Sequence, residues 1–219
     1  MEKIKEKLLS ANLWNEVVEK ELKALWKYGI DRIESTWTKA SVVDFLEEET
    51  PLSFFINPAS PSKRHHPAWQ NKEAGMLRNT TECCLIVDMQ LRSFKKFCGV
   101  LDEIIPWTRD VVLAATILSD TFKYDKQILD GVEIVSPGKV NPNHGKIAAN
   151  IWRDKYAKRH GVAREKEIFE ATYWHLGRWT PGWTPKIKFS TLTKIVHRID
   201  AIMADNSLEL LYTPKDAIE

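Results

Sequence analysis

The sequence predicts an all-α fold with an N-terminal helical extension. Its apolar residues recur at three- and four-residue steps over most of the chain, which is typical of amphipathic helices. Proline- and glycine-rich stretches separate these segments, and one short stretch is rich in β-branched residues, which leaves room for a small β-hairpin. The chain has 219 residues, 43% hydrophobic and 28% charged, and this composition is typical of one globular domain with a buried core.

We expect three parts in this helical bundle. Residues 1–50 form a helical extension that packs on the core, residues 51–210 form the main helical domain, and residues 211–219 form a C-terminal tail. Within the extension, residues 2–28 place Ile, Leu, Val and Trp among Glu and Lys at helical spacing, which indicates an amphipathic helix or a helix pair. Residues 50–72 contain four prolines, so we expect a long ordered loop there.

The middle of the chain is predicted to supply the central helix. The helical pattern returns over residues 73–97. Pro106 opens the next helix, expected over residues 108–123, and apolar residues lie almost all round it, as in a fully buried helix. Residues 131–140 are rich in turn residues and include a short β-prone run, which makes them the candidate hairpin.

Further helices are expected in the last third of the chain. One runs over residues 144–160 with Asn143 as its N-cap, and others run over residues 163–174 and 190–204. Glycine and proline interrupt residues 177–185 between the last two helices. Three of the nine tryptophans crowd around this loop: Trp174, Trp179 and Trp183.

Charge and cysteine content predict a cytoplasmic protein without naming its partner. Lys and Arg total 32 against 30 Asp and Glu, and a formal charge of +2 does not by itself indicate a nucleic-acid or membrane partner. Three cysteines can form at most one disulfide, so at least one thiol stays free. Adjacent cysteines such as Cys83 and Cys84 rarely form a disulfide with each other, and we therefore expect a reducing environment. No apolar run approaches the roughly 18 to 20 residues that a membrane span needs, so we expect no membrane contact.

Histidines and aspartates at the ends of the predicted helices are the candidate functional residues. No P-loop, no dinucleotide-binding glycine motif and no Gly-x-Ser-x-Gly elbow occurs, which argues against the commonest phosphate-binding and acyl-transfer sites. Imidazole and carboxylate are instead the side chains that hold divalent metal ions in helical bundles. The candidates are His65, His66, Asp120, His144, His175, His197 and Asp200.

Several of these residues also have a purely structural explanation. His144 alone is typical of a surface histidine in the first turn of a helix, and His175 fits a core histidine bonded to a backbone carbonyl equally well. Asp120 and Asp200 differ, because each lies in an apolar helix. A buried aspartate there is costly unless it is paired, capped or bound to a metal, which favours a functional role for both.

The order of these residues resembles the HD-domain superfamily of metal-dependent phosphohydrolases, from about Pro58 to Asp205. The family's elements are a His-His-Ala loop leading into Gly-Gly-Leu-Leu-Glu-His-Thr, an apolar helix ending in His-Asp-Ile-Gly-Lys, a His-Gly helix start, a His-His-Gly segment and a closing His-x-x-Asp helix. The corresponding segments here are His65-His66-Pro67-Ala68 with Ala74 to Thr80, Ser119-Asp120-Thr121-Phe122-Lys123, His144-Gly145, His175-Leu176-Gly177 and His197-Arg198-Ile199-Asp200.

Two positions depart from that pattern. Asn79 stands where the family has its first metal-binding histidine, and Ser119 stands where it has the histidine of the His-Asp pair. An amide oxygen and a neutral hydroxyl bind a transition metal less strongly than imidazole does. The resemblance therefore implies a weakened first metal site, whereas Asp120, His144 and His175 correspond to the ligands of the second metal in two-metal members of the family.

The resemblance implies a defined set of candidate residues and leaves open whether the protein is an active enzyme. If active, it hydrolyses phosphoesters or phosphoanhydrides of nucleotides or nucleic acids with a divalent ion such as Mn, Fe, Zn, Ni or Mg. The implied metal ligands are Asp120, His144, His175 and Asp200. The implied catalytic residues are Asp120 and Lys123. The implied substrate-binding residues are His65, His66, Arg178 and Trp179.

Two other functions stay open at this point. With a lost site, the fold serves as a non-catalytic module that binds a nucleotide, a nucleic-acid end or a protein. Alternatively, the amphipathic helix of residues 2–28 supplies the contact of a homo-oligomer in a structural or assembly protein. A phosphorylated small molecule or a nucleic-acid end is the partner expected under the first two readings.

Overall fold

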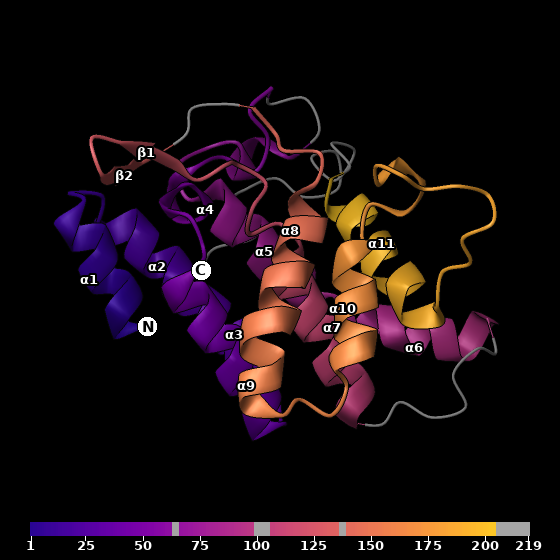
Figure 1. Cartoon of the computed structure of the whole chain (residues 1–219). Helices are drawn as coiled ribbons and strands as arrows, with labels where there is room; N and C mark the ends of the chain where they lie inside the picture. The colour runs from indigo at the N-terminus through magenta and orange to yellow at the C-terminus, as the bar shows by residue number, and fades with distance from the viewer. Residues whose placement is uncertain (63–65, 99–105, 136–138, 205–219) are drawn as a thin grey trace.

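The structure is a computed structural model that describes residues 1–62, 66–98, 106–135 and 139–204 (Figure 1). It is mainly helical with one two-stranded antiparallel hairpin, which confirms the predicted all-α class and the small hairpin. Among the described residues, no helix combines the length and the apolar character needed to cross a bilayer. The predicted tail of residues 211–219 lies outside the described residues.

The helices and strands follow one another in a simple order. The helices are α1 (Glu2–Ser10), α2 (Glu16–Tyr28), α3 (Thr36–Glu48), α4 (Leu52–Ile56), α5 (Gly75–Leu85), α6 (Val87–Cys98), α7 (Pro106–Ser119), α8 (His144–Ile151), α9 (Lys158–His160), α10 (Glu165–Tyr173) and α11 (Thr191–Met203). The strands are β1 (Gln127–Leu129) and β2 (Val132–Ile134). A π-helical segment, Trp152–Ala157, joins α8 to α9, and single 3-10 turns occur at Ile30–Arg32, Ala68–Gln70 and Gly177–Trp179.

Helix α7 is the centre of the bundle. It packs against α3, α5, α8, α10 and α11, and its residues from Val111 to Leu118 are almost entirely shielded from solvent. A helix that is apolar all round must be surrounded in this way, because any exposed side would leave apolar surface in water. Its C-terminal end therefore delivers Ser119 and Asp120 into the middle of the protein.

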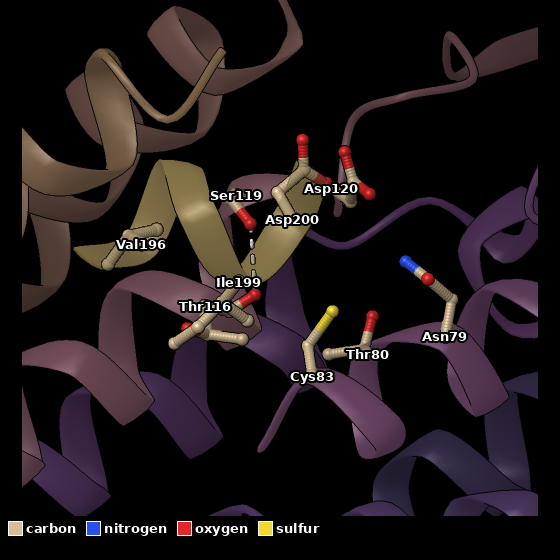
Figure 2. Close-up of a pocket in the computed structure, with 9 residues that line it drawn as sticks. All are labelled: Asn79, Thr80, Cys83, Thr116, Ser119, Asp120, Val196, Ile199 and Asp200. Carbon is tan, nitrogen blue, oxygen red and sulfur yellow. Dashed lines mark hydrogen bonds between the residues drawn. The ribbon is translucent and has the colours of Figure 1, made fainter. Parts of the chain in front are cut away.

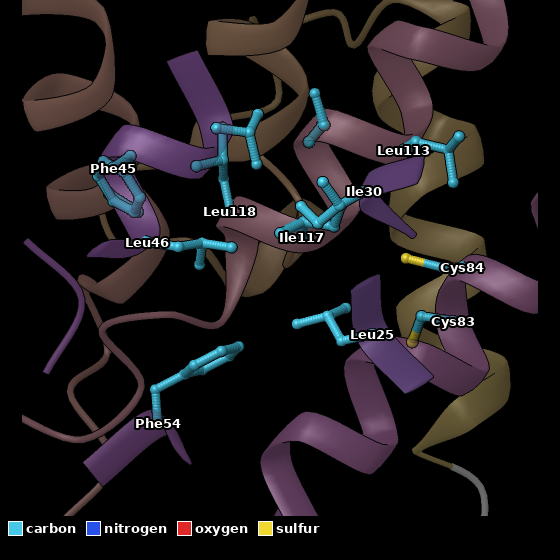
Figure 3. Close-up of a cluster of buried hydrophobic side chains, with 14 of the residues drawn as sticks. Leu25, Ile30, Phe45, Leu46, Phe54, Cys83, Cys84, Leu113, Ile117 and Leu118 are labelled. Carbon is cyan, nitrogen blue, oxygen red and sulfur yellow. The ribbon is translucent and has the colours of Figure 1, made fainter. Parts of the chain in front are cut away.

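The N-terminal residues share the hydrophobic core with the rest of the chain. Residues 2–28 form a helix pair, and the Asn15 side chain caps α2 by accepting the backbone N–H groups of Val17 and Val18. Figure 3 shows Leu25 and Ile30 among buried side chains of α5 and α7. The core is thus continuous across residue 50, and the domain boundary expected there stays a prediction.

Local details differ from the expected elements where turn chemistry decides the backbone. The helix expected over residues 73–97 is two helices that meet at Ile86, and the loop expected over residues 50–72 contains α4. The hairpin begins before Gly131, because Asp130 and Gly131 both adopt positive φ and form its two-residue turn. Asn143 makes no side-chain cap of α8; its N–H instead donates to Asn141 Oδ1.

Candidate metal centre

Three buried side chains converge from separate helix ends. Asp120 follows α7, His144 is the first residue of α8, and His175 lies in the turn after α10. None of the three residues is more than 4% exposed, and one ligand atom from each lies within 4.8 Å of the others. Asp120 Oδ1 is 3.0 Å from His144 Nε2 and 3.7 Å from His175 Nε2. The two Nε2 atoms are 3.0 Å apart.

The hydrogen bonds behind the two imidazoles fix where their protons lie. His144 Nδ1 is 2.6 Å from the Asn141 carbonyl oxygen, and His175 Nδ1 is 2.9 Å from the Thr172 carbonyl oxygen. A carbonyl only accepts, so both Nδ1 atoms carry hydrogen, and a ring in its neutral form presents a lone pair at Nε2. The two Nε2 atoms and a carboxylate oxygen therefore face one another. This arrangement needs a proton or a cation between them, and metal-binding histidines have the same Nδ1–H to carbonyl support.

The charge states suit a cation. Burial, and then the neighbouring His144, lower the pKa of His175 to about 3, so this ring is neutral at physiological pH. Burial opposes ionisation of Asp120, but Lys123 and then His144 outweigh it and hold the pKa of this carboxyl well below its ordinary value. Lys123 Nζ lies 3.4 Å from Asp120 Oδ2 and leaves Oδ1 to the histidines. A neutral imidazole and an ionised carboxylate are the forms that bind metal ions.

Two further residues hold His175 in place. His197 Nδ1, on α11, is 2.7 Å from the His175 carbonyl oxygen and donates a hydrogen bond to it. Gly145, beside His144, allows the His175 ring to approach the backbone of α8, because a Cβ at this position would lie 2.5 Å from His175 Nδ1. The approach is closer than any side chain permits, which explains a glycine in the first turn of a helix.

Gly145→Ala should therefore damage the site. The added methyl group must push the His175 ring away from His144, since it would also meet the Thr172 carbonyl oxygen at 2.8 Å. We expect a loss of about 1 to 3 kcal/mol in the free energy of unfolding and about a tenfold weaker affinity for Zn²⁺ or Mn²⁺. Urea unfolding and metal titration measure the two effects. Ala148→Gly in the same helix is the control, and equal metal affinity in Gly145→Ala and wild type would contradict the expectation.

A small cavity adjoins Asp120 (Figure 2). Its volume is about 10 Å³, roughly the space for one water molecule. Figure 2 shows the Thr80 hydroxyl and the Cys83 sulfur pointing from α5 toward the carboxylates of Asp120 and Asp200. The other residues around the cavity are Asn79, Thr116, Ser119, Val196 and Ile199.

Polar atoms without partners surround this cavity. Asn79 Oδ1, Thr80 Oγ1 and Thr116 Oγ1 are buried, and none has a hydrogen-bonding partner among the described residues. Buried polar oxygens are costly to leave unsatisfied, so a bound water molecule or ion is expected to satisfy them. The partly buried Asp200 faces the same space, and burial together with the nearby Asp120 carboxylate raises its pKa to about 7.

The sequence-predicted residues do not all lie at one site. Asp120, His144 and His175 come together, whereas Asp200 lies on the adjoining cavity and is not one of the three clustered ligands. Arg178 and Trp179 are exposed: Arg178 lies over the Trp179 ring, which packs against His197.

His66 belongs to a different polar cluster. It is buried, its Nδ1 is 2.9 Å from Gln70 Oε1, and Gln70 Nε2 donates to Glu82. It does not line the cavity beside Asp120. His65 lies outside the described residues.

The sequence prediction assigned no role to four residues of the site: Thr80, Cys83, Thr116 and Gly145. A signal existed for two of them. Thr116 and Asp120 are four residues apart, as are Asn79 and Cys83, and residues at that spacing share a face of a helix. Gly145 stands in the His-Gly element quoted above, but its structural role was not apparent, because the His175 ring that it accommodates comes from another helix.

No family model, no curated protein sequence and no solved structure matches this chain. The resemblance to HD-domain proteins therefore depends on the sequence elements quoted above. The functional argument below depends on the atoms of the site.

Proposed function

We propose that this protein is an HD-like, metal-dependent phosphohydrolase that acts on phosphoesters or phosphoanhydrides of nucleotides or nucleic acids. The observation that carries the proposal is the convergence of two Nε2 lone pairs and an ionised carboxylate on one buried point. Two imidazoles and one carboxylate favour Mn, Fe, Ni or Zn over Mg. Three protein ligands are also the usual number in a catalytic site that keeps a position open.

The residues around this point have distinct proposed roles. A divalent ion there would supply Lewis acidity, which neutralises charge on a phosphoryl oxygen and makes a bound water more acidic. Asp200, with a pKa of about 7, accepts a proton from a water in the cavity. Lys123 keeps Asp120 ionised through its contact with Oδ2. The exposed Arg178 binds the phosphate of the substrate.

In this proposal the adjoining cavity, which Asn79 and Ser119 line, holds a water molecule rather than a metal ion. Ser119 Oγ donates to the Thr116 carbonyl oxygen, and Asn79 Oδ1 faces the cavity without a partner among the described residues. Neither offers the nitrogen lone pair that a transition metal prefers. One ion at Asp120, His144 and His175, with a water beside it, therefore accounts for the polar atoms present.

A non-catalytic binding module is the second candidate function. The cavity of about 10 Å³ does not admit a nucleotide, while the Arg178 and Trp179 pair stands on the surface. Under this alternative the ion is structural and the ligand binds outside. In both cases we place the protein in the cytoplasm, a setting that suits the free thiols of Cys83 and Cys84.

Asp120→Asn tests the proposed function directly. It removes the carboxylate charge that both histidines face, so we expect about a hundredfold or greater loss of affinity for Mn²⁺ or Zn²⁺ and no detectable hydrolysis. Isothermal titration gives the affinity, and phosphate release from nucleoside mono- and triphosphates and short oligonucleotides gives the activity. Asp154→Asn, which changes a half-exposed carboxylate, is the matched control.

The outcomes separate the candidate functions. Hydrolysis that is lost in Asp120→Asn and kept in Asp154→Asn supports the phosphohydrolase. Metal binding with no turnover of any phosphate ester supports the module. Wild-type protein that binds no divalent ion, or Asp120→Asn that binds one as tightly, contradicts both the metal site and the activity.

A further inference from the structure

We propose that the loop after His175 and the exposed face of α11 form a binding surface for single-stranded nucleic acid. The surface, called the basic ridge below, consists of Arg178, Trp179, Lys186, Lys188, Lys194 and Arg198. That the bound nucleic acid leads toward the metal centre rests on the proposed function, whereas binding of the nucleic acid can be measured without metal.

The charge of this segment is one-sided. No acidic residue occurs between Glu170 and Asp200, a stretch that holds all five cations of the ridge. The whole chain is nearly neutral, with 32 basic and 30 acidic residues, so the excess is local. All six ridge side chains are exposed. An excess of exposed cations in one segment of a protein attracts a polyanion.

The ridge lysines are not neutralised by the protein itself. Within the described part of the chain, Lys186, Lys188 and Lys194 form no ion pair with a carboxylate. The basic residues between α8 and α10 behave differently, because Lys155 pairs with Glu49 and Arg159 pairs with Glu48. Those cations are already compensated, whereas Lys186, Lys188 and Lys194 retain their charge for a ligand.

Packing joins the loop and α11 into one surface. The Trp179 and His197 rings are 5.6 Å apart, and Trp174 and Phe189 are 5.9 Å apart. The Ser190 N–H donates to Glu170 on α10, which fixes the end of the loop. In Figure 1 this yellow loop runs along the outer edge of the bundle beside α10 and α11.

One end of the ridge lies next to the metal centre. Lys146, two residues after His144, reaches the loop at Gly182, where a Cβ would lie 3.4 Å from its Nζ. Trp179 contacts His197, which holds the His175 backbone. This end of the ridge is therefore connected to both histidines, through His197 to the His175 backbone and through Lys146 to the first turn of α8.

The chemistry favours a strand with unstacked bases. The Trp179 side chain is 63% exposed, which leaves indole surface for a base, and base stacking on aromatic rings tolerates any sequence. The neighbouring cavity is too small for a nucleoside, so bases must stay on the surface. A duplex hides its base faces and would gain only the phosphate contacts.

Fluorescence anisotropy with labelled 12-nucleotide DNA and RNA strands, in EDTA, tests the ridge. We expect the double variant Lys186→Glu with Lys188→Glu to weaken binding about tenfold or more. The slope of log affinity against log salt concentration should become shallower by the equivalent of about one to two phosphate contacts. Trp179→Ala should weaken binding about tenfold with the salt dependence unchanged. Lys20→Glu with Lys27→Glu, an equal charge change on exposed positions of α2, is the matched control and should bind as wild type does.

Three results would overturn the ridge: no binding at 50 mM salt, equal losses in the ridge and control variants, or a duplex bound as tightly as the strand. The test is independent of the metal. His144→Ala should still bind strands in EDTA; if wild type binds strands but never hydrolyses a phosphate ester, the proposed function fails and the ridge stands. If mononucleotides are hydrolysed but strands do not bind, the ridge alone fails.

Discussion

Asp200→Asn is expected to raise the free energy of unfolding of the metal-free protein at pH 8 by up to about 4 kcal/mol. Burial, and then the Asp120 carboxylate, raise the pKa of Asp200 from 3.8 to about 7 in the folded protein. Above pH 7 the folded state therefore holds a carboxylate in an unfavourable place, whereas the unfolded chain holds it in water. An amide removes that charge. A penalty of this kind is typical of sites arranged for function rather than stability.

The pH dependence gives the sign of this effect. Between pH 3.8 and about 7 the folded state binds more protons at Asp200 than the unfolded state does, so this group stabilises the fold as the pH decreases. The advantage of Asp200→Asn over wild type should shrink below pH 7 and vanish near pH 4. His175 acts in the opposite direction: its pKa of about 3 means that its contribution is full above 6.5 and is lost as the pH falls below that value.

Urea unfolding of metal-free wild type and Asp200→Asn at pH 8 and pH 4.5 measures the effect. Because both proteins keep His175, its contribution cancels in the difference at each pH. Asp31→Asn, which alters a side chain that is 62% exposed, is the control and should change stability by less than about 0.5 kcal/mol. If Asp200→Asn were less stable than wild type at pH 8, the Asp200 carboxylate of the wild type would have a favourable partner, and the expectation would be wrong.

Loading the protein with Zn²⁺ or Mn²⁺ should stabilise it by about 4 kcal/mol when the free ion is a thousand times its dissociation constant. The physical reason is the pair of Nε2 lone pairs that lie 3.0 Å apart beside Asp120. An ion converts their repulsion into attraction, and only the folded chain brings them together. Thermal or urea unfolding with and without the ion, at pH 7.5, measures the gain.

The matched variants exploit two histidines with different surroundings. His175→Ala removes one of the three clustered side chains and should abolish the stabilisation by metal. His160→Ala removes a histidine that pairs with Asp44 at the other end of the helix from His144, and it should keep the full stabilisation. If His175→Ala gained as much from metal as wild type, the ion would bind elsewhere.

The helical fold and the burial of Asp120 were predictable because they depend on local patterns, whereas local sequence alone gave His144 and His175 a structural explanation as well. The apolar run of α7 fixed its burial, and an aspartate directly after such a helix has to be compensated. The break at Ile86 and the start of the hairpin at Gln127 were not predictable from periodicity, because side-chain spacing continues across turns. The facing Nε2 lone pairs and the unsatisfied oxygens of Asn79 and Thr116 depend on the packing of separate helices, which spacing along the chain does not contain.

The carbonyl contacts of His144 and His175 have a consequence for selectivity. Each ring is anchored at Nδ1, so neither can rotate freely to follow an ion of a different radius. Little side-chain entropy remains to be lost on binding, which favours ions whose bond lengths match the existing spacing. Such a rigid frame should discriminate among metals by size, and the two carbonyls of Asn141 and Thr172 set that size.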